Sequence, residues 1–210
     1  MPQTPPRKTR SDITTPGLTT DQLHQQLLQL KPCLIQESVA NDPWKLLVAV
    51  TLLNKTAGKL AIPVFWSIMS AWPTAWALSQ APESELVTLI RPLGTQNTHP
   101  PCAMNGPLEP WAPPISPRKR EKYPPTPISH LPGAGAYALD SYRIFCSGPA
   151  SEEWKDVNPS DKELIRYLKW KWAAMENRRW TPESGAGGTA DPAYLEALVS
   201  ELEPALQQEQ

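Results

Sequence analysis

The sequence lacks any long apolar run, and this absence excludes a helix that spans a membrane. Such a span needs about 18 or more apolar residues in succession, and no stretch of the 210 residues comes near that length. The N-terminus (MPQTPPRKTRSD) is polar and basic with no apolar stretch behind it, which argues against a secretory signal. We therefore expect no membrane partner.

Cysteine is also scarce. An odd number of widely spaced thiols suits a reducing compartment, provides no disulfide framework and cannot supply a four-cysteine cluster within one chain. The histidines are not spaced with cysteines or acids as metal ligands would be. We expect no metal and no cofactor. The residues concerned are Cys33, Cys102, Cys146, His24, His99 and His130.

An excess of charge of one sign is missing as well, because 20 basic and 21 acidic residues leave a net charge of −1. Global charge therefore does not indicate nucleic-acid binding. Short basic clusters at residues 7–10 and 118–122 are most often solubilising, and less often they import a protein into the nucleus or contact phosphate. P-loop, G-x-S-x-G and H-E-x-x-H motifs are absent.

Proline, in contrast, is abundant. The chain has 26 prolines, more than twice the roughly 5% of average proteins, and eleven of them lie between Pro100 and Pro132. This distribution predicts one domain interrupted by proline-rich chain. The expected parts are a disordered basic tail (1–19), a helical domain in two pieces (20–95 and 128–176), a proline-rich disordered insertion or replaced segment (96–127), and a flexible acidic tail with a weak helix (177–210).

Elsewhere, helical spacing of apolar residues dominates and no strand-like alternation stands out. Asp42 and Pro43 fit the cap and first position of a helix, and Gly94 fits a C-cap. Pro63 is expected to kink or split a helix over 56–72. Most tryptophans fall at helical spacing beside leucine and isoleucine, which predicts core packing, including Trp66, Trp72, Trp76, Trp170 and Trp172.

Two features of the second piece could carry chemistry. Gly133 and Gly135 lie in a turn expected between two helices, where they could seat a phosphate on backbone N–H groups or simply close the turn. Asp161 follows Asn-Pro-Ser at the head of a predicted helix. It could be an N-cap, a carboxylate directed into a cleft, or both.

Together these motifs resemble the helix-hairpin-helix DNA glycosylases, and within them the glycosylase domain of the methyl-CpG-binding-domain mismatch glycosylases. The similarity covers residues 33–95 and 128–173. It rests on Leu34-Ile-Gln-Glu37, Asp42-Pro-Trp-Lys-Leu-Leu47, Leu53-Asn-Lys-Thr-Ala-Gly-Lys59, Ala61-Ile-Pro-Val64, Leu131-Pro-Gly-Ala-Gly-Ala-Tyr137, Asp140-Ser-Tyr-Arg-Ile-Phe-Cys146 and Val157-Asn-Pro-Ser-Asp161.

The resemblance implies an all-α helix-hairpin-helix glycosylase fold in which a proline-rich loop replaces one family helix. It also implies a monomeric nuclear enzyme of base excision repair. Its substrate would be double-stranded DNA, from which it would remove thymine or uracil at G·T or G·U mismatches by flipping the base and hydrolysing its N-glycosidic bond.

By the same resemblance, Asp161 is the catalytic aspartate, which would stabilise the oxocarbenium-like sugar and activate water. Ile35 and Gln36 line the base pocket. Tyr137 also belongs to this pocket and stands where lyase-active relatives carry a nucleophilic lysine. Since tyrosine forms no Schiff base, we expect a monofunctional glycosylase without strand cleavage.

Further positions would contact DNA. Leu131, Gly133 and Gly135 form the hairpin that holds the DNA backbone. Lys55 stands where relatives have an arginine that fills the space left by the flipped base. Thr95 occupies the position of a bulky residue that wedges into the duplex.

Two other hypotheses stay open. In the first, the chain is a DNA-binding module that has lost turnover together with the wedge and the family helix. In the second, it is a degenerate product of a mis-spliced or mispredicted gene and does not fold stably.

Overall fold

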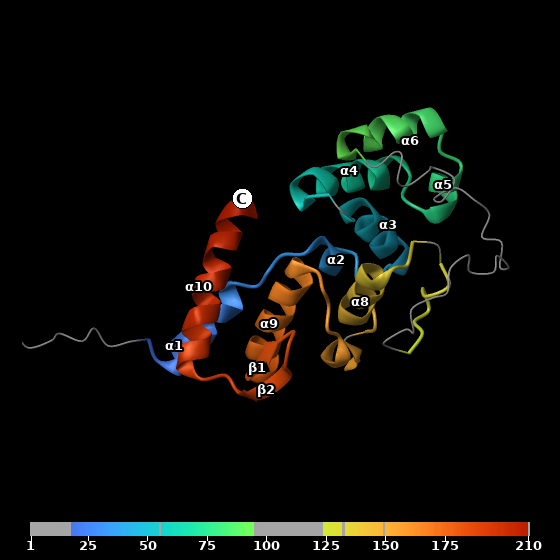
Figure 1. Ribbon diagram of the computed structural model, residues 1–210. Coiled ribbons are helices and arrows are strands. Elements are labelled where there is room, and N and C mark those ends of the chain that lie inside the picture. The colour runs from blue at the N-terminus through green and yellow to red at the C-terminus, as the bar shows by residue number, and fades with distance from the viewer. Residues whose placement is uncertain (1–17, 55, 95–123, 132, 149, 210) are drawn as a thin grey trace, which may run out of the picture.

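The computed structural model describes residues 18–54, 56–94, 124–131, 133–148 and 150–209 (Figure 1). This part of the chain is mostly helical, as the sequence predicts, and adds one antiparallel hairpin. None of its helices is both long enough and apolar enough to cross a membrane. The elements are α1 (Thr20–Gln29), α2 (Ile35–Ser38), α3 (Pro43–Leu53), α4 (Gly58–Ala71), α5 (Ala75–Ser79), α6 (Glu83–Ile90), η1 (Arg91–Leu93), α8 (Ala136–Phe145), η2 (Glu153–Asp156), α9 (Lys162–Glu176), β1 (Arg178–Thr181), β2 (Gly185–Thr189) and α10 (Pro192–Glu209).

The helix boundaries follow the local signals of the sequence. The Asp42 carboxylate accepts hydrogen bonds from the N–H groups of Trp44 and Lys45, and Pro43 is the first residue of α3. Gly94 ends η1 with a φ of 67°, a conformation that glycine adopts without steric cost. Pro63 lies inside one continuous helix, α4, and does not split it.

Two clusters of buried side chains form the core, and Figure 1 displays the corresponding groups of helices. The first cluster joins α1, α9, the β1–β2 hairpin and α10. The second joins α2, α3, α4 and α6. Helix α8 contributes to both, with Ile144 in the first cluster and Ala138 and Tyr142 in the second. Tyr137, in the first turn of α8, packs against both clusters, so the start of α8 lies where they meet.

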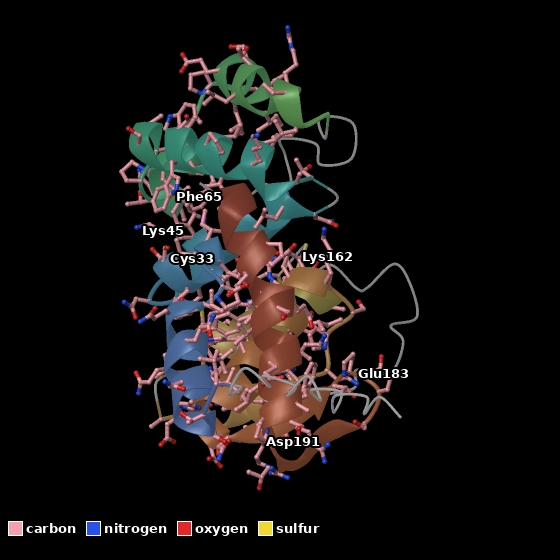
Figure 2. All side chains as sticks on the ribbon, turned by 90° about the vertical axis from the view of Figure 1, so that its left-hand side faces the viewer. Cys33, Lys45, Phe65, Lys162, Glu183 and Asp191 are labelled. Atoms are coloured by element: carbon pink, nitrogen blue, oxygen red, sulfur yellow. The ribbon has the colours of Figure 1, made fainter. Side chains whose placement is uncertain are left out.

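The C-terminal segment differs from the flexible tail that the sequence predicts. Strands β1 and β2 pair in antiparallel register, with Trp180 opposite Ala186. Leu195, Leu198 and Leu202 of α10 are buried in the first cluster, and Figure 2 shows α10 running beside α1. The sequence pattern did not predict the strands, because β2 (GAGGT) has almost no side chains that could alternate between apolar and polar. Burial of Trp180 and of the three leucines stabilises the segment against the helices.

The tryptophans divide into two groups. Trp170 and Trp172 are buried in the first cluster, which confirms their predicted core role, and Trp72 packs partly against the second. The prediction is wrong for Trp66 and Trp76, which are 48% and 75% exposed. Phe65, next to Trp66, is buried, and successive helical residues point about 100° apart, so only one of the pair faces the core.

The chain before the hairpin turn also departs from expectation. Residues 124–131 form extended chain and turns, so the described residues contain no helix directly before the turn. Ile128 nevertheless reaches into the second cluster. Residues 1–17 and 95–123 lie outside the described residues, and they contain most of the expected N-terminal tail and of the proline-rich segment.

Candidate active site

Asp161 is the N-cap of α9, and within the described residues only one of its two carboxylate oxygens accepts hydrogen bonds. Oδ1 accepts hydrogen bonds from the N–H groups of Glu163 and Leu164, both at 3.0 Å. Within the described residues, Oδ2 has no hydrogen-bond partner. Figure 2 labels the next residue, Lys162, which marks this end of α9. The helix thus fixes the carboxylate through Oδ1, which confirms that Asp161 is an N-cap.

The base-pocket residues predicted on α2 are both buried. Ile35 belongs to the second cluster, and Gln36 is only 2% exposed. The Gln36 side-chain amide donates from Nε2 to the hydroxyl oxygen of Tyr137 at 2.7 Å. A buried glutamine requires such a partner because an unsatisfied amide is costly. The structure therefore brings Gln36 and Tyr137 into direct contact.

Tyr137, in the first turn of α8, packs against both clusters, and the charge of Asp161 acts on its phenol. Burial raises the pKa of Tyr137 strongly, and the negative charge of Asp161 raises it further, while the hydrogen bond from Gln36 lowers it. The phenol is therefore neutral over the physiological pH range. The hydrogen bond joins the segments around residues 36 and 137, and the charge of Asp161 acts on the same phenol.

In the turn at Leu131–Gly135, only the first of the two glycines adopts the left-handed conformation that glycine permits, since Gly135 has a φ of −79°. Gly133 has a φ of 85°, and both Gly133 and Gly135 are exposed. The N–H of Ala134 donates to the Leu131 carbonyl at 3.2 Å, and the N–H of Gly135 donates to the Gly133 carbonyl at 2.8 Å. These two amides are used inside the turn. The amides that lack intrahelical partners are those of the first turn of α8, beginning with Ala136.

The two remaining predicted DNA contacts, Lys55 and Thr95, lie outside the described residues. In the described ranges, no three His, Cys, Asp or Glu side chains gather as a metal site would require.

Sequence reasoning missed Arg143, a buried residue of α8. Its guanidinium donates from Nη2 to the carbonyl of Pro124, so it holds the chain that leads into the glycine turn. A signal was present in the sequence: a charged residue stands among Tyr142, Ile144 and Phe145 in an otherwise apolar stretch. Charged residues are rarely buried without a partner, so this position points to a structural contact.

Comparison with known proteins finds relatives that include two DNA glycosylases, although no protein-family model matches the chain. A methyl-CpG-binding domain protein 4-like protein of Arabidopsis thaliana is 34% identical over 137 residues, which are 65% of this chain and 28% of the relative. A thymine-DNA glycosylase of Aeropyrum pernix is 41% identical over 56 residues, 27% of this chain and 25% of the relative. A thymine/uracil-DNA glycosylase of Pyrobaculum aerophilum is 27% identical over 142 residues, 67% of this chain and 57% of the relative. The chain thus matches between a quarter and somewhat more than half of these relatives' length.

Proposed function

This chain is related to DNA glycosylases, and we propose that it is a monofunctional enzyme that removes thymine or uracil from G·T and G·U mismatches. The observation that carries the proposal is the hydrogen bond between Gln36 and Tyr137 where the two core clusters meet, together with the charge of Asp161, which raises the pKa of the same phenol. These residues come from three separate parts of the sequence. They combine a carboxylate with a free oxygen, a buried amide and a neutral phenol.

In the proposed reaction, Asp161 acts at the sugar. Breaking the N-glycosidic bond leaves positive charge on C1′ and its ring oxygen, and a carboxylate held by two backbone amides can stabilise that charge. Oδ2 is free to orient a water molecule and accept its proton as the water oxygen bonds to C1′. The base departs with the bonding electrons, and an abasic site remains.

Gln36 and Tyr137 would recognise the flipped base. A pyrimidine such as thymine or uracil presents carbonyl oxygens and an N–H on its pairing edge, and a glutamine amide can both donate to and accept from such an edge. Ile35 would supply an apolar wall. The Tyr137 phenol cannot form the Schiff base that strand cleavage requires, so the product would be an intact strand with an abasic site.

The glycine turn and the first turn of α8 would bind the DNA backbone. Gly133 and Gly135 are exposed and lack side chains, and the N-terminus of a helix attracts phosphate. We extend the proposal to Leu131 in this turn and, outside the described residues, to Lys55 and Thr95. The expected partner is double-stranded DNA, and the proposed location is the nucleus, with the enzyme acting as a monomer.

The test is an assay for abasic sites. Purified protein is incubated with G·T and G·U duplexes, the products are treated with alkali, and strand breaks are measured for the wild type and for Asp161→Asn. We expect breaks with the wild type after alkali only, and none with Asp161→Asn. Duplex binding without product would overturn the proposed glycosylase activity and favour the hypothesis of a DNA-binding module. Strand nicking without alkali would contradict monofunctional action.

A thermal unfolding measurement addresses the remaining hypothesis. Two buried clusters that share α8 should unfold in one cooperative transition. Absence of any transition would favour the degenerate product.

A further inference from the structure

Helix α2 has only four residues and cannot fix its own position. Its N-cap, Leu34, makes no side-chain capping hydrogen bond, and a single helical turn is unstable without external contacts. The orientation of Gln36 on this helix therefore depends on bonds that α2 makes with other elements. One of these bonds is the contact of Gln36 itself with Tyr137.

A second set of contacts starts from Glu37, the residue after Gln36. The Glu37 carboxylate forms an ion pair with Lys31 through Oε1. The same oxygen accepts a hydrogen bond from the Tyr167 hydroxyl at 3.4 Å. The Lys31 ammonium in turn lies 5.5 Å from the centre of the Trp170 ring. Glu37 thus links α2 to α9 by two routes.

Tyr167 is a rigid anchor for this link. Its side chain is buried, and its ring packs against Phe145 of α8 at 4.8 Å and against Trp170 at 5.6 Å between ring centres. Burial, followed by the charge of Glu37, raises the pKa of Tyr167, so its hydroxyl stays protonated and can donate. Helix α9 also begins at Asp161. The anchor and the proposed catalytic carboxylate therefore belong to the same helix.

From these contacts we infer that Glu37 is a positioning residue that connects α2 to α9 through Tyr167 and Lys31 and so holds Gln36 in its hydrogen bond with Tyr137. This inference rests on the proposed function, because Gln36 matters only if a base enters the site. Glu37 itself touches neither Tyr137 nor Asp161 in any hydrogen bond or ion pair among the described residues. Its effect on the reaction would be transmitted by α2.

The test compares Glu37→Ala, Glu37→Gln and Tyr167→Phe with a matched control, Glu201→Ala. Like Glu37, Glu201 forms an ion pair with a lysine: both of its carboxylate oxygens accept hydrogen bonds from the ammonium of Lys169 on α9 at 2.9 Å. The exposed fractions of the two glutamate side chains are also similar, 45% for Glu201 and 38% for Glu37. It belongs to α10, and among the described residues no hydrogen bond or ion pair joins it to α2. The two glutamates therefore differ chiefly in which element they tie to α9.

The first readout is the single-turnover rate of base release from G·U duplexes at saturating protein. Misplacement of a reacting or orienting group by about 1 Å can cost up to ~100-fold, and we expect Glu37→Ala to slow release by about tenfold or more. Glu37→Gln should recover part of the rate, because its amide oxygen still accepts from Tyr167. Tyr167→Phe combined with Glu37→Ala should be no slower than Glu37→Ala alone, since both changes remove the same link. Glu201→Ala should match the wild type.

The second readout does not require activity. The side-chain amide resonance of Gln36 in nitrogen-15 labelled protein reports its hydrogen bond to Tyr137. We expect this resonance to move toward the position of a solvent-exposed amide in Glu37→Ala and to stay in place in Glu201→Ala. An unchanged resonance in Glu37→Ala, or equal slowing by Glu37→Ala and Glu201→Ala, would overturn the positioning role. An inactive wild type whose Gln36 resonance still moves in Glu37→Ala would contradict the proposed function and leave the link between α2 and α9 standing.

Discussion

The hydrogen bond from Gln36 Nε2 to the Tyr137 hydroxyl joins two residues that are 101 positions apart in the sequence. Gln36 is buried on a one-turn helix, and Tyr137 packs against both core clusters at the start of α8. Their contact connects the two pieces of sequence that flank the proline-rich segment. The stability and chemistry of this junction lead to four predictions.

Asp161 has a structural role and a proposed chemical role, and two substitutions separate them. Asparagine caps helices about as well as aspartate, so Asp161→Asn should keep the free energy of unfolding close to that of the wild type. Asp161→Ala removes the acceptor for the Glu163 and Leu164 amides and should cost about 1 kcal/mol. Urea unfolding followed by circular dichroism measures both values. Equal stability of the two variants would contradict the capping role.

The two glycines of the turn should respond differently to alanine. Gly133 has a φ of 85°, which costs a residue with a Cβ roughly 1–2 kcal/mol, and the added Cβ would lie 3.9 Å from the Thr51 hydroxyl without a clash. Gly135 has a φ of −79° and nothing within 4 Å of an added Cβ. Gly135 is also the N-cap of α8, where alanine is a poorer residue than glycine, so this loss offsets the gain in chain entropy and Gly135→Ala should change stability by less than about 1 kcal/mol. Thermal unfolding of both variants is the measurement, and a larger loss from Gly135→Ala would contradict the geometry of the turn.

Helix α10 should behave as part of the core. Leu195 is fully buried, and its replacement by alanine should cost about 2–5 kcal/mol through lost burial and the cavity left behind. The control is Leu60→Ala on α4, where a leucine that is 54% exposed should change stability by about 0.5 kcal/mol at most. Denaturant unfolding at equilibrium compares the two. If Leu195→Ala were as mild as Leu60→Ala, the C-terminal helix would not be packed as described.

High pH should destabilise the protein through its buried phenols. Burial raises the pKa of Tyr137 and of Tyr167 above the ordinary value of about 10, so the folded state keeps protons that the unfolded state loses. The contribution of these phenols to the free energy of unfolding is fully present below about pH 10 and decreases as the pH rises further. Burial also raises the pKa of Cys146, to about 11, which acts in the same direction.

The measurement is urea unfolding between pH 8 and pH 11. Tyr167→Phe removes one titrating group and should make the decline in unfolding free energy shallower. If the unfolding free energy declined identically with pH in the wild type and in Tyr167→Phe, the Tyr167 phenol would not be the source of the pH dependence. The absorbance of tyrosinate gives an independent measure, because the two buried phenols should ionise at a higher pH than free tyrosine.

Much of the fold follows from short-range patterns in the sequence. Asp42 with Pro43 predicts the start of α3, Gly94 predicts the end of η1, and Asp161 predicts the start of α9. These signals are readable because capping and left-handed glycine involve atoms within a few residues of each other. The resemblance to glycosylases likewise depends on local motifs, and the related proteins agree with it.

The packing of individual faces was harder to predict. Trp66 and Trp76 have the spacing of core residues and are exposed, while Arg143 is charged and buried. Sequence spacing identifies an apolar stripe but not which neighbouring helix covers it. The C-terminal hairpin was not predicted, and the helix predicted in this segment was expected to be weak and flexible, whereas α10 packs in the first cluster with α1 and α9.

Local patterns in the sequence predict where most helices begin and end, and the resemblance to glycosylases supplies the candidate site residues. The contact of Gln36 with Tyr137, the contact of Glu37 with Tyr167 and the burial of Trp180 and of the α10 leucines in the first cluster emerge only in the folded protein. Helix caps are local and leave a trace in a few neighbouring letters. Contacts between residues 100 or more positions apart depend on how buried surfaces fit together, and that fit is a property of the folded chain.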